Sequence, residues 1–287
     1  MISTLFKRKR KAGPPSKPSV PAGATVWAVG DIHGRQDLLQ PLVEAIITDS
    51  EAAPASRTVV IFLGDYIDRG PNSRGVLQYL AALPKKDGIE WRFLKGNHEA
   101  AMLDFLRRPA AGVRWCEYGG DAALRSYGLR PPALTHRPEA WARLSADLNH
   151  KLSDAERRFL ENLELSVTIG DYFFAHAGAR PGEALEHQTE EDLLWIRRSF
   201  LQSEVAFEKV VVHGHTPAAE VYADHRRVGI DTRAYDSGVL TALRLEGTGR
   251  AILQAVAESP HSLTGDGATF APVSLRPRAF EDVRQPA

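Results

Sequence analysis

The sequence predicts an α/β protein, and two observations support that prediction. From residue 25 onward, short apolar runs alternate with longer stretches whose apolar residues recur at helical spacing, the pattern of β-α-β units packed around a sheet. The 287 residues are 43% apolar and 25% charged, which is an ordinary globular composition. This composition excludes a disordered chain, because such a chain would lack the apolar content for a core.

Three pairs of a strand followed by a helix open the pattern. The expected strands are TVWAVG (25–30), TVVIFLG (58–64) and EWRFLKG (90–96). The helix patterns that follow them are QDLLQPLVEAII, RGVLQYLAAL and HEAAMLDFLRR. We therefore expect three successive strand-to-helix turns, each of which can carry functional residues.

Residues 107–162 lose the strand pattern, and we expect a helical insertion there, with helix N-caps at Asp121 and Ser153. Strand patterns then return, spaced closely enough to predict a second, largely antiparallel or mixed sheet. These strands are ELSVTIG, YFFAHAG, KVVVHGH, RRVGID and VLTALRLE. The Ser-, Pro- and Gly-rich residues 258–287 are expected to form a loose tail, so the folded domain should span 23–257.

Residues 1–22 differ in charge from the rest of the chain. They hold six basic and no acidic side chains, which leaves 30 basic and 36 acidic residues elsewhere, a net charge of −6. A solvated, disordered arm is the simpler interpretation, and weak attachment to an anionic membrane or to nucleic acid is the alternative. We expect no nucleic-acid partner, and the oligomeric state is left open.

Nothing in the sequence approaches the roughly 18 uninterrupted apolar residues of a membrane span, and the N-terminal pattern is not that of a secretory signal. The single cysteine, Cys116, excludes an intrachain disulfide framework and favours a reducing cytoplasm. We expect this thiol to be inert, and we interpret Trp115, Tyr118 and Tyr127 of the insertion as packing residues.

A polar cluster follows each of the first three strands. The clusters are GDIHG (30–34), GDYIDRG (64–70) and GNHE (96–99). Asp31 and Asp65 are 34 residues apart, and Asp65 and Asn97 are 32 apart, each close to the length of one β-α repeat. Right-handed crossovers would therefore bring all three clusters to the same edge of the sheet, where ligands of such folds collect.

Two later strands end in histidine, one at His176 and the other at His213 and His215. Carboxylate oxygen together with imidazole nitrogen suits borderline divalent ions such as Mn, Fe or Zn. Six protein ligands are too many for one catalytic ion, but two ions about 3.5–4 Å apart could share them through a bridging carboxylate. Taken singly, the aspartates would be interpreted as helix N-caps and His176 as a core residue.

Five short segments, taken in chain order, resemble the motifs of the calcineurin-like metallophosphoesterases. They are GDIHG, GDYIDRG, GNHE, HAG and HGHT. Within that superfamily they are similar to the phosphoprotein phosphatases, which include the bacterial and bacteriophage-lambda type Ser/Thr phosphatases. The resemblance spans roughly residues 25–246. It implies a four-layer α/β/β/α sandwich of two mixed sheets flanked by helices. It also implies two divalent metal ions at the loop edge, with Mn expected and Fe or Zn as alternatives.

The resemblance assigns six of these side chains to the metal ions. The first ion would take Asp31 and His33, Asp65 would bridge, and the second ion would take Asn97, His176 and His215. His213 is left as a supporting or structural residue.

The resemblance also assigns the catalytic and substrate-binding roles. His98 would protonate the leaving oxygen, and Asp68 would hold its imidazole in orientation. Arg69 would bind the free oxygens of the phosphate through its planar fork. Arg197 matches a second arginine of the family, although the adjacent Arg198 is an alternative.

The reaction that the resemblance implies is hydrolysis of phosphomonoesters, by direct attack of a metal-bridging hydroxide and without a phosphoenzyme. Phosphoserine and phosphothreonine in proteins are the expected substrates, and small phosphomonoesters stay open. A symmetrical diadenosine tetraphosphatase or another nucleotide polyphosphate hydrolase is the first alternative. Those enzymes often show Asn-Arg-Gly where this chain has Asp68-Arg69-Gly70, which favours the monoesterase.

A non-catalytic scaffold, bound to membrane or nucleic acid through the basic arm, is the second alternative. Its expected mark is a broken ligand set, and no ligand is missing here. The segment IDTRAYDSG (230–238) resembles the family's IDTG, with Arg233 in place of the glycine. Both contact with a substrate anion and a solvent-facing loop are open interpretations of that arginine.

Overall fold

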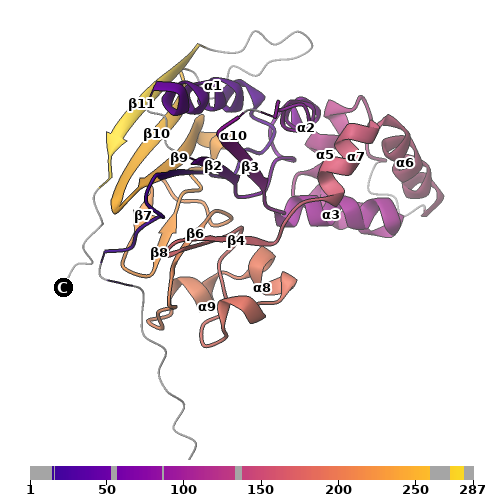
Figure 1. Ribbon diagram of the computed structural model, residues 1–287. Helices are drawn as coiled ribbons and strands as arrows, with labels where there is room; N and C mark the ends of the chain where they lie inside the picture. Colours follow the sequence, from indigo (N-terminus) through magenta and orange to yellow (C-terminus); the bar gives the residue numbers. More distant parts are fainter. Residues whose placement is uncertain are drawn as a thin grey trace, which may run out of the picture.

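Figure 1 shows the computed structural model of the chain. It describes residues 15, 17–52, 57–85, 87–132, 138–258 and 272–280. The five consecutive basic residues of the expected arm, Lys7 to Lys11, lie outside these ranges. In the part of the chain that is described, two β-sheets face each other at the centre and helices pack outside them, so the expected four-layer α/β/β/α architecture is confirmed.

The first sheet has the strand order β11-β10-β9-β1-β2-β3 among the described residues. Its strands are β1 (Ala24–Val29), β2 (Arg57–Phe62), β3 (Ile89–Phe93), β9 (Val239–Glu246), β10 (Gly249–Ala257) and β11 (Val273–Ala279). β1, β2 and β3 are parallel, whereas β9 pairs antiparallel with β1. The predicted β-α repeats therefore form the parallel half of this sheet.

The second sheet has the order β4-β5-β6-β8-β7. Its strands are β4 (Ser166–Ile169), β5 (Tyr172–Ala175), β6 (Val210–His213), β7 (Tyr222–Ala223) and β8 (Arg227–Gly229). The three central strands, β5, β6 and β8, are parallel, and the outer two pair antiparallel, so this sheet is mixed as expected.

The helices follow the strands in chain order. They are α1 (Gln36–Ala52), α2 (Ser73–Ala81), α3 (Asn97–Arg107), α4 (Gly112–Glu117), α5 (Gly120–Ser126), α6 (Pro138–Lys151), α7 (Asp154–Glu161), α8 (Glu190–Trp195), α9 (Arg198–Leu201) and α10 (Ala234–Ser237). Two 3-10 turns, η1 (Pro109–Ala111) and η2 (Leu185–His187), complete the set among the described residues. No helix in these ranges is both long and apolar enough to cross a bilayer.

The period-two alternation of strand side chains explains the layering. On β1, Trp27 and Val29 face the α1 side, whereas Val26 and Ala28 face the second sheet. Between the sheets these residues meet side chains such as Phe174 of β5. The outer face of the second sheet packs against α8 and α9. The inner strands β1, β2, β5 and β6 are therefore buried on both faces, which is why the sequence shows near-continuous apolar runs there.

The segment VLTALRLE corrects one expectation, because it does not join the second sheet. As β9 it pairs with β1 of the first sheet, with Val29 opposite Ala242. β9 then turns tightly at Gly247, whose φ is 53°, into β10, a strand that the sequence analysis does not separate. The apolar pattern identifies a strand, but it carries no information about a partner more than 200 residues away.

The expected loose tail also needs correction, since Val273–Ala279 forms β11 and pairs antiparallel with β10 along its length. Pro277 is compatible with this position because β11 is an edge strand and its outer side needs no ladder hydrogen bond. The N-terminal boundary moves as well. Val20 is buried in the inter-sheet core, and the Ser19 N–H donates to Asp171 Oδ2 at 2.9 Å. The folded domain therefore begins before residue 23.

The expected helical insertion, residues 107–162, contains η1 and α4 to α7 (Figure 1). Ser153 caps α7 as predicted, in a capping box with Glu156. Asp121 is not the cap of α5, because Gly119 in a left-handed conformation takes that position. Asp121 lies in the first turn instead and pairs with Arg125 one turn later.

Candidate metal centre

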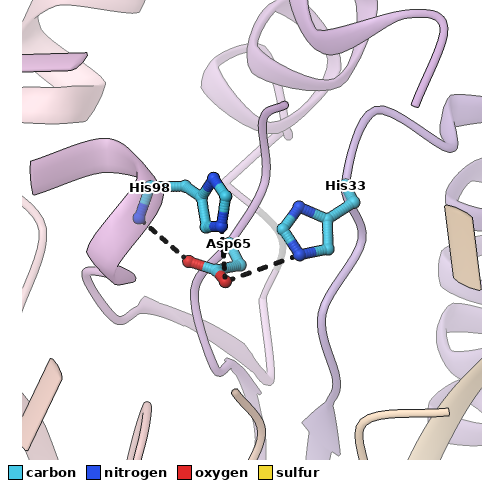
Figure 2. Close-up of side chains that lie close together, drawn as sticks. All are labelled: His33, Asp65 and His98. Carbon is cyan, nitrogen blue, oxygen red and sulfur yellow. Dashed lines mark hydrogen bonds and ion pairs between the residues drawn. The ribbon is translucent and has the colours of Figure 1, made fainter. Parts of the chain in front are cut away.

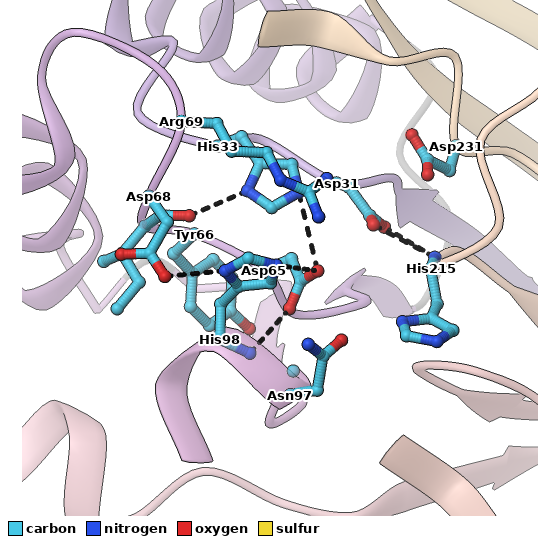
Figure 3. A network of polar contacts seen from close by, with 12 residues as sticks. Asp31, His33, Asp65, Tyr66, Asp68, Arg69, Asn97, His98, His215 and Asp231 are labelled. Carbon is cyan, nitrogen blue, oxygen red and sulfur yellow. Dashed lines mark hydrogen bonds and ion pairs between the residues drawn. The ribbon is translucent and has the colours of Figure 1, made fainter. Parts of the chain in front are cut away.

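Most of the side chains that the sequence analysis singles out gather at one edge of the two sheets (Figure 3). Asp31 and His33 follow β1, Asp65, Asp68 and Arg69 follow β2, Asn97 and His98 open α3, His176 follows β5, and His215 follows β6. All of these side chains except Arg69 are buried. Residues from five strand ends, up to 184 positions apart in the chain, therefore meet in one place.

The backbone at this edge is unusually bent. Among the described residues, the non-glycine residues with left-handed φ are His33 (46°), Asp65 (51°), Asp68 (72°), Arg69 (63°), His215 (61°) and Arg233 (60°). Such conformations cost about 1–3 kcal/mol each and concentrate where function requires a particular geometry. Five of the six belong to the motif clusters.

Two glycines of the motifs are needed because the chain approaches a carboxylate too closely for a side chain. A Cβ on Gly96 would lie 2.1 Å from Asp65 Oδ1, and one on Gly214 would lie 2.0 Å from Asp31 Oδ1. Both distances are far below van der Waals contact. The glycines therefore let two candidate ligand carboxylates sit against backbone.

Asp65 lies at the centre of the cluster (Figure 2). Its Oδ2 is 3.5 Å from His33 Nε2 and 3.8 Å from His98 Nε2, and its Oδ1 is 3.3 Å from His176 Nε2. Burial alone would raise the pKa of Asp65, but the surrounding imidazoles outweigh burial and lower it below its ordinary value. The carboxylate is therefore ionised and is shared between two groups of histidines.

His176 shows most clearly why a cation fits here. Its Nδ1–H donates to the Leu63 carbonyl at 2.9 Å, and this leaves a lone pair on Nε2. That Nε2 lies 3.0 Å from Asn97 Oδ1 and 3.3 Å from Asp65 Oδ1, neither of which carries a proton. Burial lowers the pKa of His176, so a proton on Nε2 is disfavoured. Three lone pairs therefore converge where a divalent cation would satisfy them.

His215 extends this group on the other side. Its Nδ1 is 3.2 Å from His176 Nε2, and its buried Nε2 has no hydrogen-bond partner among the described residues. Burial and the neighbouring His176 lower the pKa of His215 to about 2, so the ring is neutral. Asp65, His176 and His215 offer ligand atoms that all lie within 4.8 Å of one another.

His33 is prepared in the same way as His176. Its Nδ1–H donates to the Ile67 carbonyl at 2.8 Å, which turns the lone pair of Nε2 toward Asp65 and fixes the tautomer. Burial and the nearby His98 hold the pKa of His33 well below its usual value. In this conformation Nε2 accepts a hydrogen bond from Arg69 Nη1 at 3.0 Å, so a positive group already faces it.

Asp31 adds a second carboxylate, and Asp231 a third that the sequence analysis did not assign. Asp31 accepts the His215 N–H at 3.0 Å. Burial, together with the Asp231 and Asp65 carboxylates, raises the pKa of Asp31 well above its usual value. Burial raises the pKa of Asp231 to about 6. Crowded buried carboxylates with neutral imidazoles form a donor set that suits divalent cations. The only sequence signal for Asp231 was its place in the segment 230–238.

His98 has a different partner from the other histidines. Its Nδ1–H donates to Asp68 Oδ2 at 2.6 Å, and the same oxygen accepts the indole N–H of Trp115 at 2.8 Å. Burial lowers the pKa of His98, but the carboxylates of Asp65 and Asp68 outweigh burial and raise it above its usual value. Interpreting Trp115 as a packing residue was therefore incomplete. No sequence pattern links two residues 47 positions apart.

Glu99 is a positioning residue to which the sequence analysis gave no role. Its fully buried carboxylate accepts backbone N–H groups from Gly96 at 2.9 Å, Asp65 at 3.0 Å, Tyr66 at 2.8 Å and Ile67 at 3.3 Å. It thereby ties the loop after β2 to the start of α3. The signal was present in the last letter of GNHE, because a glutamate at the N3 position of a helix can accept the N–H of the N-cap residue, here Gly96.

The remaining predicted residues lie at the margin. Arg197 is exposed at the start of α9, and its guanidinium adds to the lowering of the His176 and His215 pKa values that burial causes. Arg198 is also exposed. His213 points elsewhere: its Nε2 accepts a hydrogen bond from Arg227 Nη1 at 3.1 Å, and its Nδ1–H donates to the Gly214 carbonyl.

A groove of about 560 Å³ lies beside the centre, between α3, α4 and α8. Its lining includes the indole of Trp195, which is 41% exposed, and the ring of Tyr118, which is 45% exposed. Trp195 also contacts the candidate ligand His215, with ring centroids 6.4 Å apart. The groove therefore reaches the edge of the candidate metal centre.

Comparison with known proteins gives a consistent result. The family model described as calcineurin-like phosphoesterase matches residues 24–242. The asymmetrical bis(5'-nucleosyl)-tetraphosphatase PrpE of Bacillus subtilis is 25% identical over 236 residues, covering 75% of this chain and 88% of that protein. Serine/threonine-protein phosphatase 1 of Salmonella typhimurium is 28% identical over 227 residues, covering 77% and 92%.

Among solved structures, the cold-active protein-tyrosine phosphatase of a psychrophilic Shewanella aligns with a TM-score of 0.51 at 16% identity. The alignment covers 83% of this chain and 81% of that one. At this identity the likeness concerns the fold alone.

Proposed function

Because the chain belongs to the calcineurin-like phosphoesterase family, we propose that it hydrolyses phosphomonoesters, with phosphoserine and phosphothreonine of proteins as substrates. The observation that supports this most is the convergence on Asp65. Unprotonated ligand atoms lie on both sides of one carboxylate, and the His98–Asp68 pair lies beside it.

Two divalent cations would be held by the chain's own side chains. Asp31, His33 and Asp65 would hold the first, and Asp65, Asn97, His176 and His215 the second. Mn²⁺ is the ion we expect, with Fe and Zn as alternatives, since the set mixes carboxylate and amide oxygens with imidazole nitrogens. Bound in this way, the cations would acidify a water molecule for attack on phosphorus and neutralise charge on the phosphoryl oxygens.

The hydrogen-bond partners of the imidazoles distinguish the histidines that we expect to bind metal from the histidine that we expect to act as the general acid. His33 and His176 donate their Nδ1–H to backbone carbonyls, which leaves them neutral with an unprotonated Nε2. His98 donates to the Asp68 carboxylate, which stabilises the imidazolium form. We therefore assign to His98 the proton that the leaving oxygen receives, and to Asp68 its orientation.

The phosphate group would be bound by arginines. Arg69 lies at the centre, with its Nη1 3.0 Å from His33 Nε2. Arg197 is the second candidate, and its effect on the pKa values of His176 and His215 favours it over Arg198. Planar guanidinium groups suit the free oxygens of a phosphoryl group and stabilise the charge that develops there.

A second candidate function is hydrolysis of a dinucleoside tetraphosphate. The observation that favours it is the groove beside the centre, where Trp195 and Tyr118 expose aromatic faces on which a nucleobase could stack. The B. subtilis relative is named for such an activity. Retention of Asp68 beside Arg69 supports the monoesterase, so a direct comparison of substrates is needed.

The experiment measures p-nitrophenyl phosphate hydrolysis with Mn²⁺, by the full chain and by Asp65→Ala. We expect the variant to lose activity. Asp147→Ala, an exposed aspartate on α6, is the matched control and should keep it. Full activity of Asp65→Ala at saturating Mn²⁺ would remove the bridging role.

A phosphoserine peptide and diadenosine tetraphosphate, compared at equal concentration, separate the two candidates. We expect a higher kcat/KM for the peptide. If the tetraphosphate is the better substrate, Trp195→Ala should raise KM for it and leave KM for p-nitrophenyl phosphate unchanged.

We place the reaction in the cytoplasm, since a chain with one cysteine needs no oxidising compartment.

A further inference from the structure

We propose that Tyr235, on the short helix α10, is a positioning residue that holds the Arg69 guanidinium in place to bind the phosphate. The inference rests on the proposed function, because it concerns the residue to which phosphate binding is assigned. It adds a role for α10, in the segment 230–238, of which only Asp231 has been given one so far.

The contacts of the Tyr235 ring carry the proposal. The Cζ atom of Arg69 lies 5.0 Å from the ring centroid, within the range of a cation–π interaction. The same ring meets the His33 imidazole edge-on, with centroids 5.2 Å apart and planes at 89°. Arg69 Nη1 also donates to His33 Nε2, but a cation bound at that nitrogen would take its lone pair, so in the metal-loaded chain the Tyr235 ring is the contact that would keep holding the guanidinium.

The backbone that carries Tyr235 is fixed by hydrogen bonds. The Ala234 carbonyl accepts a hydrogen bond from Nη1 of the buried Arg35 at 2.7 Å, and Arg35 is itself paired with Asp37 at the start of α1. The Arg233 N–H donates to Asp231 Oδ1 at 2.9 Å. Tyr235 therefore projects from a rigid turn that is tied to α1 on one side and to the carboxylates of the centre on the other.

The backbone conformation of Arg233 also supports this role of Tyr235. Of the six non-glycine residues with left-handed φ in the described chain, five belong to the motif clusters and the sixth is Arg233, at the N-cap of α10. Arg233 itself is exposed and pairs with Asp236 in the next turn, so its side chain does not explain the strain. The bent backbone instead starts the helix that presents Tyr235 to Arg69.

Holding Arg69 in place matters because an arginine side chain has many rotamers, and fixing one of them on binding lowers affinity. A ring already in contact removes part of that loss before the phosphate arrives. The contact serves ground state and transition state alike, so its removal should change KM more than kcat. We expect an effect of about three- to tenfold, the range of a half-buried cation–π contact.

The test uses Tyr235→Leu and Tyr235→Phe in the full, Mn²⁺-loaded chain, each with Arg69 intact and with Arg69→Ala. Calorimetry gives the dissociation constant of inorganic phosphate, and p-nitrophenyl phosphate kinetics give KM and kcat separately. With Arg69 intact, Tyr235→Leu should weaken phosphate binding and raise KM by about three- to tenfold, while Tyr235→Phe, which keeps the ring, changes both by less than about twofold. With Arg69→Ala, Tyr235→Leu should have no further effect.

Tyr79→Leu, a half-buried tyrosine on α2, is the matched control and should leave phosphate binding unchanged. Should Tyr235→Leu fail to fold, Tyr235→Met supplies the same loss of the ring. The proposal is overturned if loss of the ring leaves phosphate binding unchanged, if it acts equally with and without Arg69, or if Tyr235→Phe is as damaging as Tyr235→Leu. Calorimetry needs no turnover, so absence of hydrolysis by the full chain would count against the proposed function and not against this coupling.

Discussion

The replacement of Asp68 by asparagine tests how His98 acts. Both donors that reach Asp68, His98 Nδ1 and Trp115 Nε1, converge on Oδ2, and its buried Oδ1 has no partner among the described residues. An asparagine whose oxygen takes the place of Oδ2 can accept both hydrogen bonds. Asp68→Asn therefore removes the charge while it keeps the geometry.

The size of the effect follows from that difference. A hydrogen bond to a charged group contributes about 1.5–3 kcal/mol and a neutral one about 0.5–1.5, so stabilisation of the imidazolium falls by about 1–2 kcal/mol. At about 1.36 kcal/mol per factor of ten, this is a roughly 5- to 30-fold loss of rate where proton donation limits turnover. The buried amide N–H₂ would also lack an acceptor, which should lower stability by about 1–3 kcal/mol.

The assay compares kcat for two leaving groups with Mn²⁺, well below the melting temperature of the variant. Dinitrophenolate leaves without help, whereas phenolate needs a proton from an acid. Asp68→Asn should therefore slow phenyl phosphate by the full factor and 2,4-dinitrophenyl phosphate much less. Trp115→Phe, which removes the other donor to Oδ2, should leave the ratio of the two rates unchanged. Equal losses on both substrates for Asp68→Asn would refute the assignment of His98 as acid.

Three further predictions concern stability and reactivity. Ser153→Ala removes the cap of α7 and half of its capping box, and should lower the free energy of unfolding by about 1 kcal/mol in urea titrations; no change would mean that the box does not stabilise α7. Burial raises the pKa of Asp224, but the N–H groups of Arg226 and Arg227 and the Arg226 guanidinium outweigh it and lower the pKa below its usual value. This carboxylate therefore stabilises the fold above its unfolded pKa of about 3.9 and ceases to do so as the pH falls toward the lower folded value, so Asp224→Asn should flatten stability against pH in that window. Burial raises the pKa of the Cys116 thiol to about 12, so iodoacetamide at pH 8 should label it slowly in the native protein and rapidly in urea, and equal rates would contradict this.

The sequence predicted the fold where its information is local. The alternation of apolar runs and helical patterns identified the parallel half of the first sheet, and Ser153 marked a helix start. The sequence did not predict which strands pair with each other when they lie far apart in the chain. Because β9 and β10 show only a strand pattern, nothing local says that β9 lies against β1 and not in the second sheet. In the sequence, the proline-containing segment of β11 resembles a tail, and it is a strand because it pairs antiparallel with β10.

The same limit applies to the site. The motif residues could be found because glycine, aspartate and histidine follow strands at regular spacing, and the structure brings them together. Trp115 and Asp231 could not be assigned, since their roles depend on neighbours 47 and 200 residues away in Asp68 and Asp31. Glu99 was visible in its motif, but only the folded loop shows four backbone N–H groups directed at one carboxylate.

The measurement that most directly tests the central claim is anomalous X-ray diffraction at the manganese edge, from crystals of the full chain grown with Mn²⁺. We predict two peaks that share Asp65, one beside Asp31 and His33 and the other beside Asn97, His176 and His215. Crystals of Asp65→Asn should lose at least one of them. A single peak away from Asp65, or none at saturating Mn²⁺, would contradict the claim that these side chains bind a pair of cations.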